Sequence, residues 1–262
     1  MRRIGIYSWF GFLLPMEERF KLMKSVGFDS TFIWWGDEFT EIDGPKERHP
    51  EMVRRQGLYI ENVHLPFENA NNLWLDSLEA DELMNTYMRS LEECAQHNIP
   101  VAVMHLTEGE VFPDSSRLGF DRLKRLVELA ERKSVSIALE NLRRSSHLGF
   151  ILSGIQSDRL GFCLDSGHQH CLTKDIDYFS LYGSRLMALH LHDNDQSYDQ
   201  HQIPGEGTID WRLLGQKLGA TGYNGAVALE VTNEFSRLKG KESPEEFLKR
   251  AYDSAITICK SL

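Results

Sequence analysis

The chain has 262 residues, 41% of them hydrophobic, as is typical of a single globular domain with a substantial core. Its formal net charge of −10 disfavours nucleic acid as a partner, because an acidic surface repels a phosphate backbone. Four scattered cysteines without a C-x-x-C pair favour the reduced thiols of a cytoplasmic protein over a disulfide framework or a zinc–thiolate site.

Short apolar runs alternate with helical patterns in the first part of the chain. The first run, IGIYSWFGFLLP, follows two arginines as in a signal peptide, but no small-residue cleavage site follows it, so we interpret it as a strand and a loop. No other run approaches the length of a membrane span, so no membrane association is expected. We expect strands at Arg3–Ser8, Phe28–Trp35, Leu58–His64 and Val101–His105, and helices at Glu17–Val26, His49–Gln56 and Ser77–His97.

The same alternation continues to the C-terminal end. We expect strands at Val135–Glu140, Leu160–Leu164, Leu186–Leu191 and Gly225–Glu230, and helices at Phe120–Lys133, His147–Gly154, Asp175–Tyr182, Trp211–Leu218 and Pro244–Cys259. The strand runs are continuously apolar, which is typical of parallel sheets buried on both faces. Eight such units predict an α/β protein with one (β/α)₈ TIM barrel domain over residues 1–262, in preference to an open doubly wound sheet.

Six consecutive strands of the predicted barrel end on a side chain that can bind a metal. These side chains are His64, His105, Glu140, Asp165, His190 and Glu230. The C-terminal ends of barrel strands meet at one rim, which carries the active site in such barrels. Imidazoles and carboxylates are suitable ligands for a divalent cation. One such residue alone could be an ordinary loop residue, but six in register predict a metal site.

The loop after the seventh predicted strand extends this ligand set. Asp199 and His201 are two residues apart, so they face the same way in an extended loop. His168 follows Asp165 by three residues, within a turn that could bring both to one pocket. His192 could orient the ligands or contact substrate, or it could point away from the site.

Further side chains near this rim are candidates for substrate binding. Arg143 and Arg144 directly follow Glu140 and could reach a substrate phosphate, although an exposed basic pair is an equally good interpretation. Aromatic side chains could form the walls of a sugar site, with core packing as the alternative for the first of them. These are Trp34, Trp35, Phe67 and Trp74.

The segments ALEN, LDSGH, HLHDND, DQHQIPGEG and ALEV resemble the xylose isomerase-like TIM barrel superfamily over nearly the whole chain. This superfamily includes sugar phosphate isomerases and epimerases and the AP endonuclease family 2 proteins. The epimerase branch implies one Mn²⁺, Mg²⁺, Co²⁺ or Zn²⁺ ion bound by Glu140, Asp165, His190 and Glu230. The endonuclease branch implies three zinc ions, for which the additional ligands would be His64, His105, His168, Asp199 and His201.

The chain differs from both branches near the ligands. The epimerases carry an arginine shortly after their metal-binding histidine, where this chain has Gln196, and a further glutamate where it has Ser146. The endonucleases follow their bridging glutamate with Asn-Thr, whereas Asn141 is followed here by Leu142.

Two enzymatic functions are therefore weighed. The favoured one is a metal-dependent isomerase or epimerase acting on a small molecule, a sugar or sugar phosphate. Glu140 and Glu230 would transfer the proton through an enediolate, while His64 and His168 would contact the substrate. The alternative is a multinuclear zinc phosphoesterase, in which Glu140 bridges two ions. A non-catalytic metal-dependent binding protein is a third interpretation, and the sequence leaves a homo-oligomeric assembly open.

Overall fold

Eight parallel strands form a closed barrel in this computed structural model, which describes residues 2–39 and 41–262. The strands are β1 (Ile4–Tyr7), β2 (Ser30–Trp34), β3 (Tyr59–His64), β4 (Val101–Met104), β5 (Ser136–Glu140), β6 (Leu160–Asp165), β7 (Leu186–His190) and β8 (Val227–Leu229). Each one lies within a residue or two of a predicted strand, so the TIM barrel prediction is confirmed.

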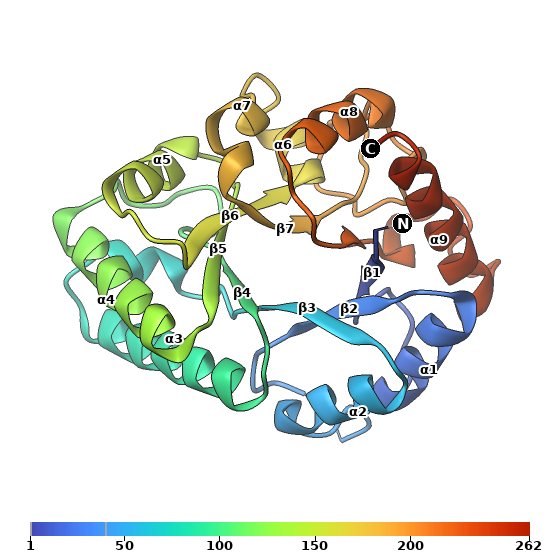
Figure 1. Cartoon of the computed structure of the whole chain (residues 1–262), viewed down its shortest axis with the longest axis horizontal. Helices are drawn as coiled ribbons and strands as arrows, with labels where there is room; N and C mark the ends of the chain where they lie inside the picture. Colours follow the sequence, from blue (N-terminus) through green and yellow to red (C-terminus); the bar gives the residue numbers. More distant parts are fainter. Residues whose placement is uncertain (1, 40) are drawn as a thin grey trace.

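Helices surround the barrel on all sides (Figure 1). They are α1 (Met16–Val26), α2 (His49–Arg55), α3 (Leu78–Gln96), α4 (Arg117–Lys133), α5 (Ser145–Gly154), α6 (Ser166–Leu172), α7 (Tyr178–Tyr182), α8 (Trp211–Ala220) and α9 (Pro244–Cys259), with short 3₁₀ turns η1 (Lys46–Arg48), η2 (Ala70–Trp74), η3 (Gly183–Arg185) and η4 (Asn233–Phe235). None of the helices in the described ranges combines the length and the apolar character needed to cross a bilayer.

Two helices differ from the sequence-based prediction because of capping side chains. Helix α4 begins three residues earlier than expected, since the Ser116 hydroxyl accepts a hydrogen bond from the Gly119 amide at 3.1 Å. The predicted turn after Asp165 is instead the start of α6. The Asp165 carboxylate caps this helix by accepting a 2.6 Å hydrogen bond from the His168 amide. The cap therefore fixes both residues of the predicted pair in one helical turn.

The last two strands close the barrel through Leu191, the residue that follows β7. Its amide donates to the carbonyl of Ala228 at 2.9 Å, and its carbonyl accepts from the amide of Glu230 at 3.0 Å. In the parallel register, Asp165 pairs with His190 and Glu140 pairs with Cys163. The strands are thus aligned so that their C-terminal residues reach the same rim.

Candidate metal centre

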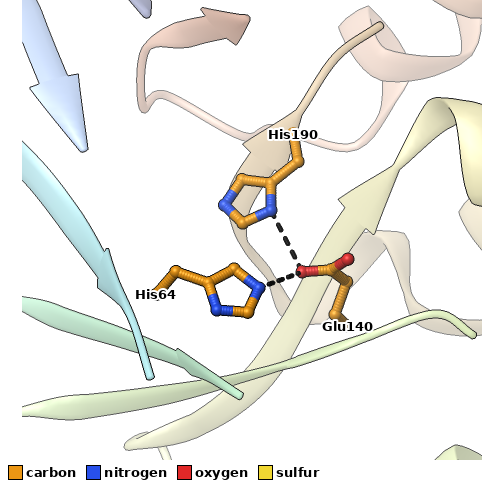
Figure 2. A group of neighbouring side chains, drawn as sticks. All are labelled: His64, Glu140 and His190. Carbon is orange, nitrogen blue, oxygen red and sulfur yellow. Dashed lines mark ion pairs between the residues drawn. The ribbon is translucent and has the colours of Figure 1, made fainter. Parts of the chain in front are cut away.

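Glu140, the last residue of β5, lies at the centre of a group of four histidines. Its side chain is buried, and its two oxygens contact a different pair of imidazoles each. Oε2 lies 3.4 Å from His64 Nε2 and 3.0 Å from His190 Nδ1, as Figure 2 shows, whereas Oε1 lies 3.3 Å from His105 Nε2 and 3.0 Å from His168 Nδ1. Strands β3, β5 and β7 and their neighbours therefore deliver these side chains to one point, as the strand endings predicted.

His190 connects Glu140 to the second carboxylate of the rim. Its Nδ1 atom lies 3.1 Å from Oε2 of Glu230, the residue that follows β8. Its ring stacks on Phe32 of β2 at a centroid distance of 4.5 Å, which holds the imidazole in the barrel mouth. Ligand atoms of Asp165, His190 and Glu230 lie within 4.8 Å of one another.

Asp199 organises a second group at the outer side of the first. Its Oδ2 atom lies 3.0 Å from His201 Nε2 and 3.3 Å from His168 Nε2, and its Oδ1 atom lies 3.5 Å from His192 Nε2. The His192 and His201 rings stack with centroids 4.0 Å apart. His192 Nε2 also lies 3.0 Å from both oxygens of Asp165, so it connects the two groups.

Both groups have the chemistry of a divalent cation site. Within the described residues, four sets place at least three ligand atoms within 4.8 Å of one another. They are His64–Glu140–His190, Glu140–Asp165–His168, Asp165–His190–Glu230 and His192–Asp199–His201. Buried atoms at their centre, including Glu140 Oε2, His190 Nδ1 and Asp199 Oδ1, converge without forming hydrogen bonds in the described chain. Buried polar atoms that form no hydrogen bond are costly, and a cation would satisfy them, so this donor set fits a metal.

The electrostatics of the metal-free centre favour charged pairs. Burial alone would raise the pKa of Glu140, but the charges of His105 and His190 lower it well below its usual range. Burial is likewise outweighed at Glu230, where His190 lowers the pKa to about 2. Burial opposes protonation of His201, yet its bond to Asp199 raises the pKa to about 10. A cation would therefore replace protons on these imidazoles when it binds.

Loop 194–210, which carries Asp199 and His201, is anchored by the buried carboxylate of Asp193. Its Oδ2 atom accepts hydrogen bonds from the Gly205 amide at 2.8 Å and from Trp211 Nε1 at 2.7 Å, and its Oδ1 atom accepts from the Ile209 amide at 3.1 Å. A Cβ on Gly207 would collide with the same carboxylate, so only glycine fits there. The sequence placed Asp193 beside the ligands as a residue that could orient them, whereas its role in anchoring the loop follows from these contacts.

Two cavities open beside the ligands, and Phe67 lines both of them. One, of about 490 Å³, reaches His105, His168 and Asp199. The other, of about 360 Å³, reaches His64, His201 and Glu230. The ligand set is therefore accessible from two sides.

Some of the predicted substrate-binding residues line a cavity beside the ligands, and others do not. Arg143 lines the 490 Å³ cavity, where its guanidinium lies 3.3 Å from Glu110, and Phe67 lines both cavities. His192 lines neither cavity and lies buried behind the ligands. Trp35 requires a correction, because it is fully buried and its indole donates to Glu93 at 2.8 Å.

Of the remaining aromatic residues, one predicted wall is a core residue and another lines a cavity, while two further cavity-lining residues were not predicted. Trp74 is also a core residue, and its indole donates to the Leu106 carbonyl at 2.6 Å. Trp34 faces the 360 Å³ cavity and stacks on His64 at 5.4 Å. Tyr7, the last residue of β1, and Trp9, two residues further along the chain, line the same cavity. The only available signal for these two residues was their position at the end of the first strand.

The sequence profile of xylose isomerase-like TIM barrels matches residues 20–251, which is most of the chain. The chain belongs to this family. Among its xylose isomerase-like relatives, an uncharacterised protein of Methanocaldococcus jannaschii is 30% identical over 233 residues, covering 81% of this chain and 78% of the relative. Fructoselysine 3-epimerase of Escherichia coli O157:H7 is 27% identical over 259 residues, covering 89% of this chain and 93% of that enzyme.

A solved structure of this fold contains a metal. The structure described as the IOLI protein with a binding zinc atom superimposes with a TM-score of 0.80 and 18% sequence identity, covering 99% of both chains. At that identity the likeness concerns the fold of the xylose isomerase-like barrel.

Proposed function

We propose that this xylose isomerase-like protein is a divalent-metal-dependent sugar isomerase or epimerase. The observation that carries the proposal is the pair of carboxylates at His190: Glu140 Oε2 and Glu230 Oε2 lie 3.0 and 3.1 Å from the same Nδ1 atom. Two carboxylates at one ligand position can flank a single substrate carbon, one to remove a proton and the other to return one. The fructoselysine 3-epimerase relative supports a sugar as the small-molecule substrate.

In this mechanism Glu140, Asp165, His190 and Glu230 would hold the cation. When bound, a divalent cation supplies stabilisation of the negative charge that develops on the substrate oxygens during enediolate formation. Glu230 lines the 360 Å³ cavity, and His190 outweighs burial there and lowers its pKa to about 2, so it is an anion at neutral pH. As the carboxylate beside the substrate, it would be the group that accepts the proton. His64 lines the same cavity and His168 the other, so both can bind substrate hydroxyl groups.

Proton exchange is the direct measurement of this function. The metal-loaded protein is incubated with ketoses in deuterated water, and we expect deuterium to appear at the carbon next to the carbonyl together with the isomer or epimer. Mn²⁺, Mg²⁺, Co²⁺ and Zn²⁺ are each supplied to protein stripped with a chelator. Absence of exchange with every ketose and every metal would contradict the proposal.

A specific observation supports phosphoester hydrolysis as the second candidate. All nine positions that the endonuclease branch uses for three zinc ions converge at this rim, in the two groups around Glu140 and Asp199. Two or three zinc ions could generate a hydroxide near neutral pH and bind the phosphate oxygens.

His201→Ala separates the two candidates. His201 contacts Asp199 in the outer group, away from Glu140, so a single ion held by the inner carboxylates should not need this imidazole. We expect the variant to retain isomerase activity within about tenfold of the parent and to lose no inner metal, because it removes contacts with Asp199, the His192 ring and the Glu230 carbonyl but no ligand of the inner ion. An inactive variant lacking one zinc ion, together with phosphoesterase activity in the parent, would favour the hydrolase.

Metal loading should stabilise the fold and release protons. At about 100 times its dissociation constant, an ion bound only to the folded state adds about 2.7 kcal/mol, which corresponds to a rise of about 5–10 °C in Tm for a chain of this size. Burial lowers the pKa of His190, but Cys163, Glu230 and Glu140 together raise it well above its usual range, whereas carboxylates such as Glu230 are already ionised. A cation must therefore displace a proton from His190, and its affinity should increase from about pH 6 to about pH 8. Differential scanning calorimetry and titration calorimetry in buffers of different ionisation enthalpy measure both effects.

A further inference from the structure

Asn141, the residue after Glu140, is fully buried although its side chain is polar. Its Oδ1 atom accepts a hydrogen bond from the Asp165 amide at 2.8 Å, and its Nδ2 atom donates to the Asp165 carbonyl at 2.9 Å. A buried amide group is costly unless it is hydrogen-bonded, and here both of its polar atoms bond the same residue. The side chain of Asn141 therefore holds the backbone of Asp165 on both sides of its Cα atom.

This pair of bonds lies where the register of β5 with β6 ends. The last register pair between the two strands is Glu140 with Cys163. Asp165 lies two residues further along β6, and it is held to the end of β5 by the side chain of Asn141. The two carboxylates of Glu140 and Asp165 are therefore connected through one short, fully buried side chain.

The main-chain carbonyl of Asn141 contacts another candidate ligand, His168. It lies 3.1 Å from Nδ1 of this imidazole, and because a carbonyl can only accept, Nδ1 is the donor. The Nε2 atom then faces Asp199 at 3.3 Å and is the nitrogen left to bind an ion. Asn141 thus bonds two candidate ligands and directly follows a third.

Asp165 is the ligand whose place depends most on this pairing. Its carboxylate belongs to two of the four ligand sets, with Glu140 and His168 in one and with His190 and Glu230 in the other. Ligand atoms must be held to within about 0.5 Å of their productive positions, and hydrogen bonds from residues behind the ligands usually do this. A shift of the Asp165 backbone would move the carboxylate away from both sets at once.

We propose that Asn141 is a positioning residue of the cation site, because its side chain fixes the Asp165 carboxylate between the two ligand sets. Asn141 lines neither cavity, so it acts through Asp165 and not on the substrate. The inference rests on the inner cation site of the function proposed above and names a residue that aligns it.

Asn71 offers a matched comparison, because its amide makes the same pair of bonds to another residue. Its Oδ1 atom accepts from the Glu108 amide at 3.1 Å, and its Nδ2 atom donates to the Glu108 carbonyl at 3.1 Å. Neither Asn71 nor Glu108 belongs to one of the four ligand sets. Both asparagines would share a role limited to joining two segments, whereas a role in metal binding distinguishes Asn141.

Titration calorimetry of chelator-stripped protein gives the dissociation constants of Mn²⁺, Mg²⁺, Co²⁺ and Zn²⁺ for the parent, Asn141→Ala and Asn71→Ala. For the ion that the parent binds most tightly, we expect Asn141→Ala to raise the constant about 10- to 100-fold, as is usual when a partner of a metal ligand is lost. Asn71→Ala should change it less than about twofold. Both variants should lower the urea midpoint, because each leaves a backbone pair without its partner.

Asn141→Leu provides a second measurement that does not depend on the alanine variant folding. Leucine fills a similar volume but forms neither hydrogen bond, so we expect the same increase in the dissociation constant. Circular dichroism and the urea midpoint show that each variant is folded at the temperature of the titration.

The outcomes distinguish this inference from the proposed function. A folded Asn141 variant with the parental dissociation constant, or an equal increase in Asn71→Ala, would overturn the positioning role while the isomerase function stands. An increase that occurs only in the Asn141 variants supports the role, and if no ketose exchanges protons, only the proposed function fails. A parent that binds none of the four ions would overturn both.

Discussion

Glu140→Gln is expected to abolish proton exchange, with kcat lowered by at least about 10³-fold. In the described structure, the Glu140 carboxylate is the one group that contacts all four histidines, His64, His105, His168 and His190. The neutral glutamine side chain of the variant therefore removes the negative charge that all four share. The variant loses a carboxylate that would bind the cation and the proton-transfer group together. Elemental analysis should show a lower metal content alongside the kinetic loss.

Two comparisons make this result specific. Glu128→Gln carries the same chemical change on an exposed part of α4 and should retain full activity. The circular dichroism spectrum of Glu140→Gln should match that of the parent, since a glutamine of the same shape fills the same buried position. A Glu140→Gln protein that exchanges protons at the parental rate would show that the Glu140 group is not the active centre.

Asp193→Ala is expected to lower the free energy of unfolding by about 3–5 kcal/mol. The carboxylate is fully buried, and it accepts from the amides of Gly205 and Ile209 and from the indole of Trp211. Removing it leaves these donors buried without an acceptor. Urea unfolding measures the loss, and Asp193→Asn should be intermediate, because the amide nitrogen faces donors that require an acceptor.

The same substitution should also affect the outer metal group. Loop 194–210 carries Asp199 and His201, so its release should weaken the binding of any cation there more than binding at Glu140. Asp195→Ala, two residues along the chain at an exposed position, is the control and should leave the urea midpoint nearly unchanged. An unchanged midpoint for Asp193→Ala would contradict the anchoring role.

The sequence by itself determined the barrel and located the inner group of candidate ligands. Continuous apolar runs of about five residues that alternate with helices are typical of parallel strands buried on both faces, and the C-terminal ends of such strands share one rim. His64, Glu140, Asp165, His190 and Glu230 are therefore located by their position directly after an apolar run. Local caps such as Asp210 before α8, whose carboxylate accepts from the Leu213 amide at 2.9 Å, were also readable from the sequence.

Only the tertiary structure decided which way neighbouring side chains point and what they contact. Trp34 and Trp35 are adjacent in a similar pattern, yet one lines a cavity and the other is a core residue, because successive side chains of an extended segment point to opposite sides. His192 enters the outer ligand group, and Asp193 anchors the loop, through contacts between distant segments. Such contacts depend on loop conformation, for which sequence periodicity carries no signal.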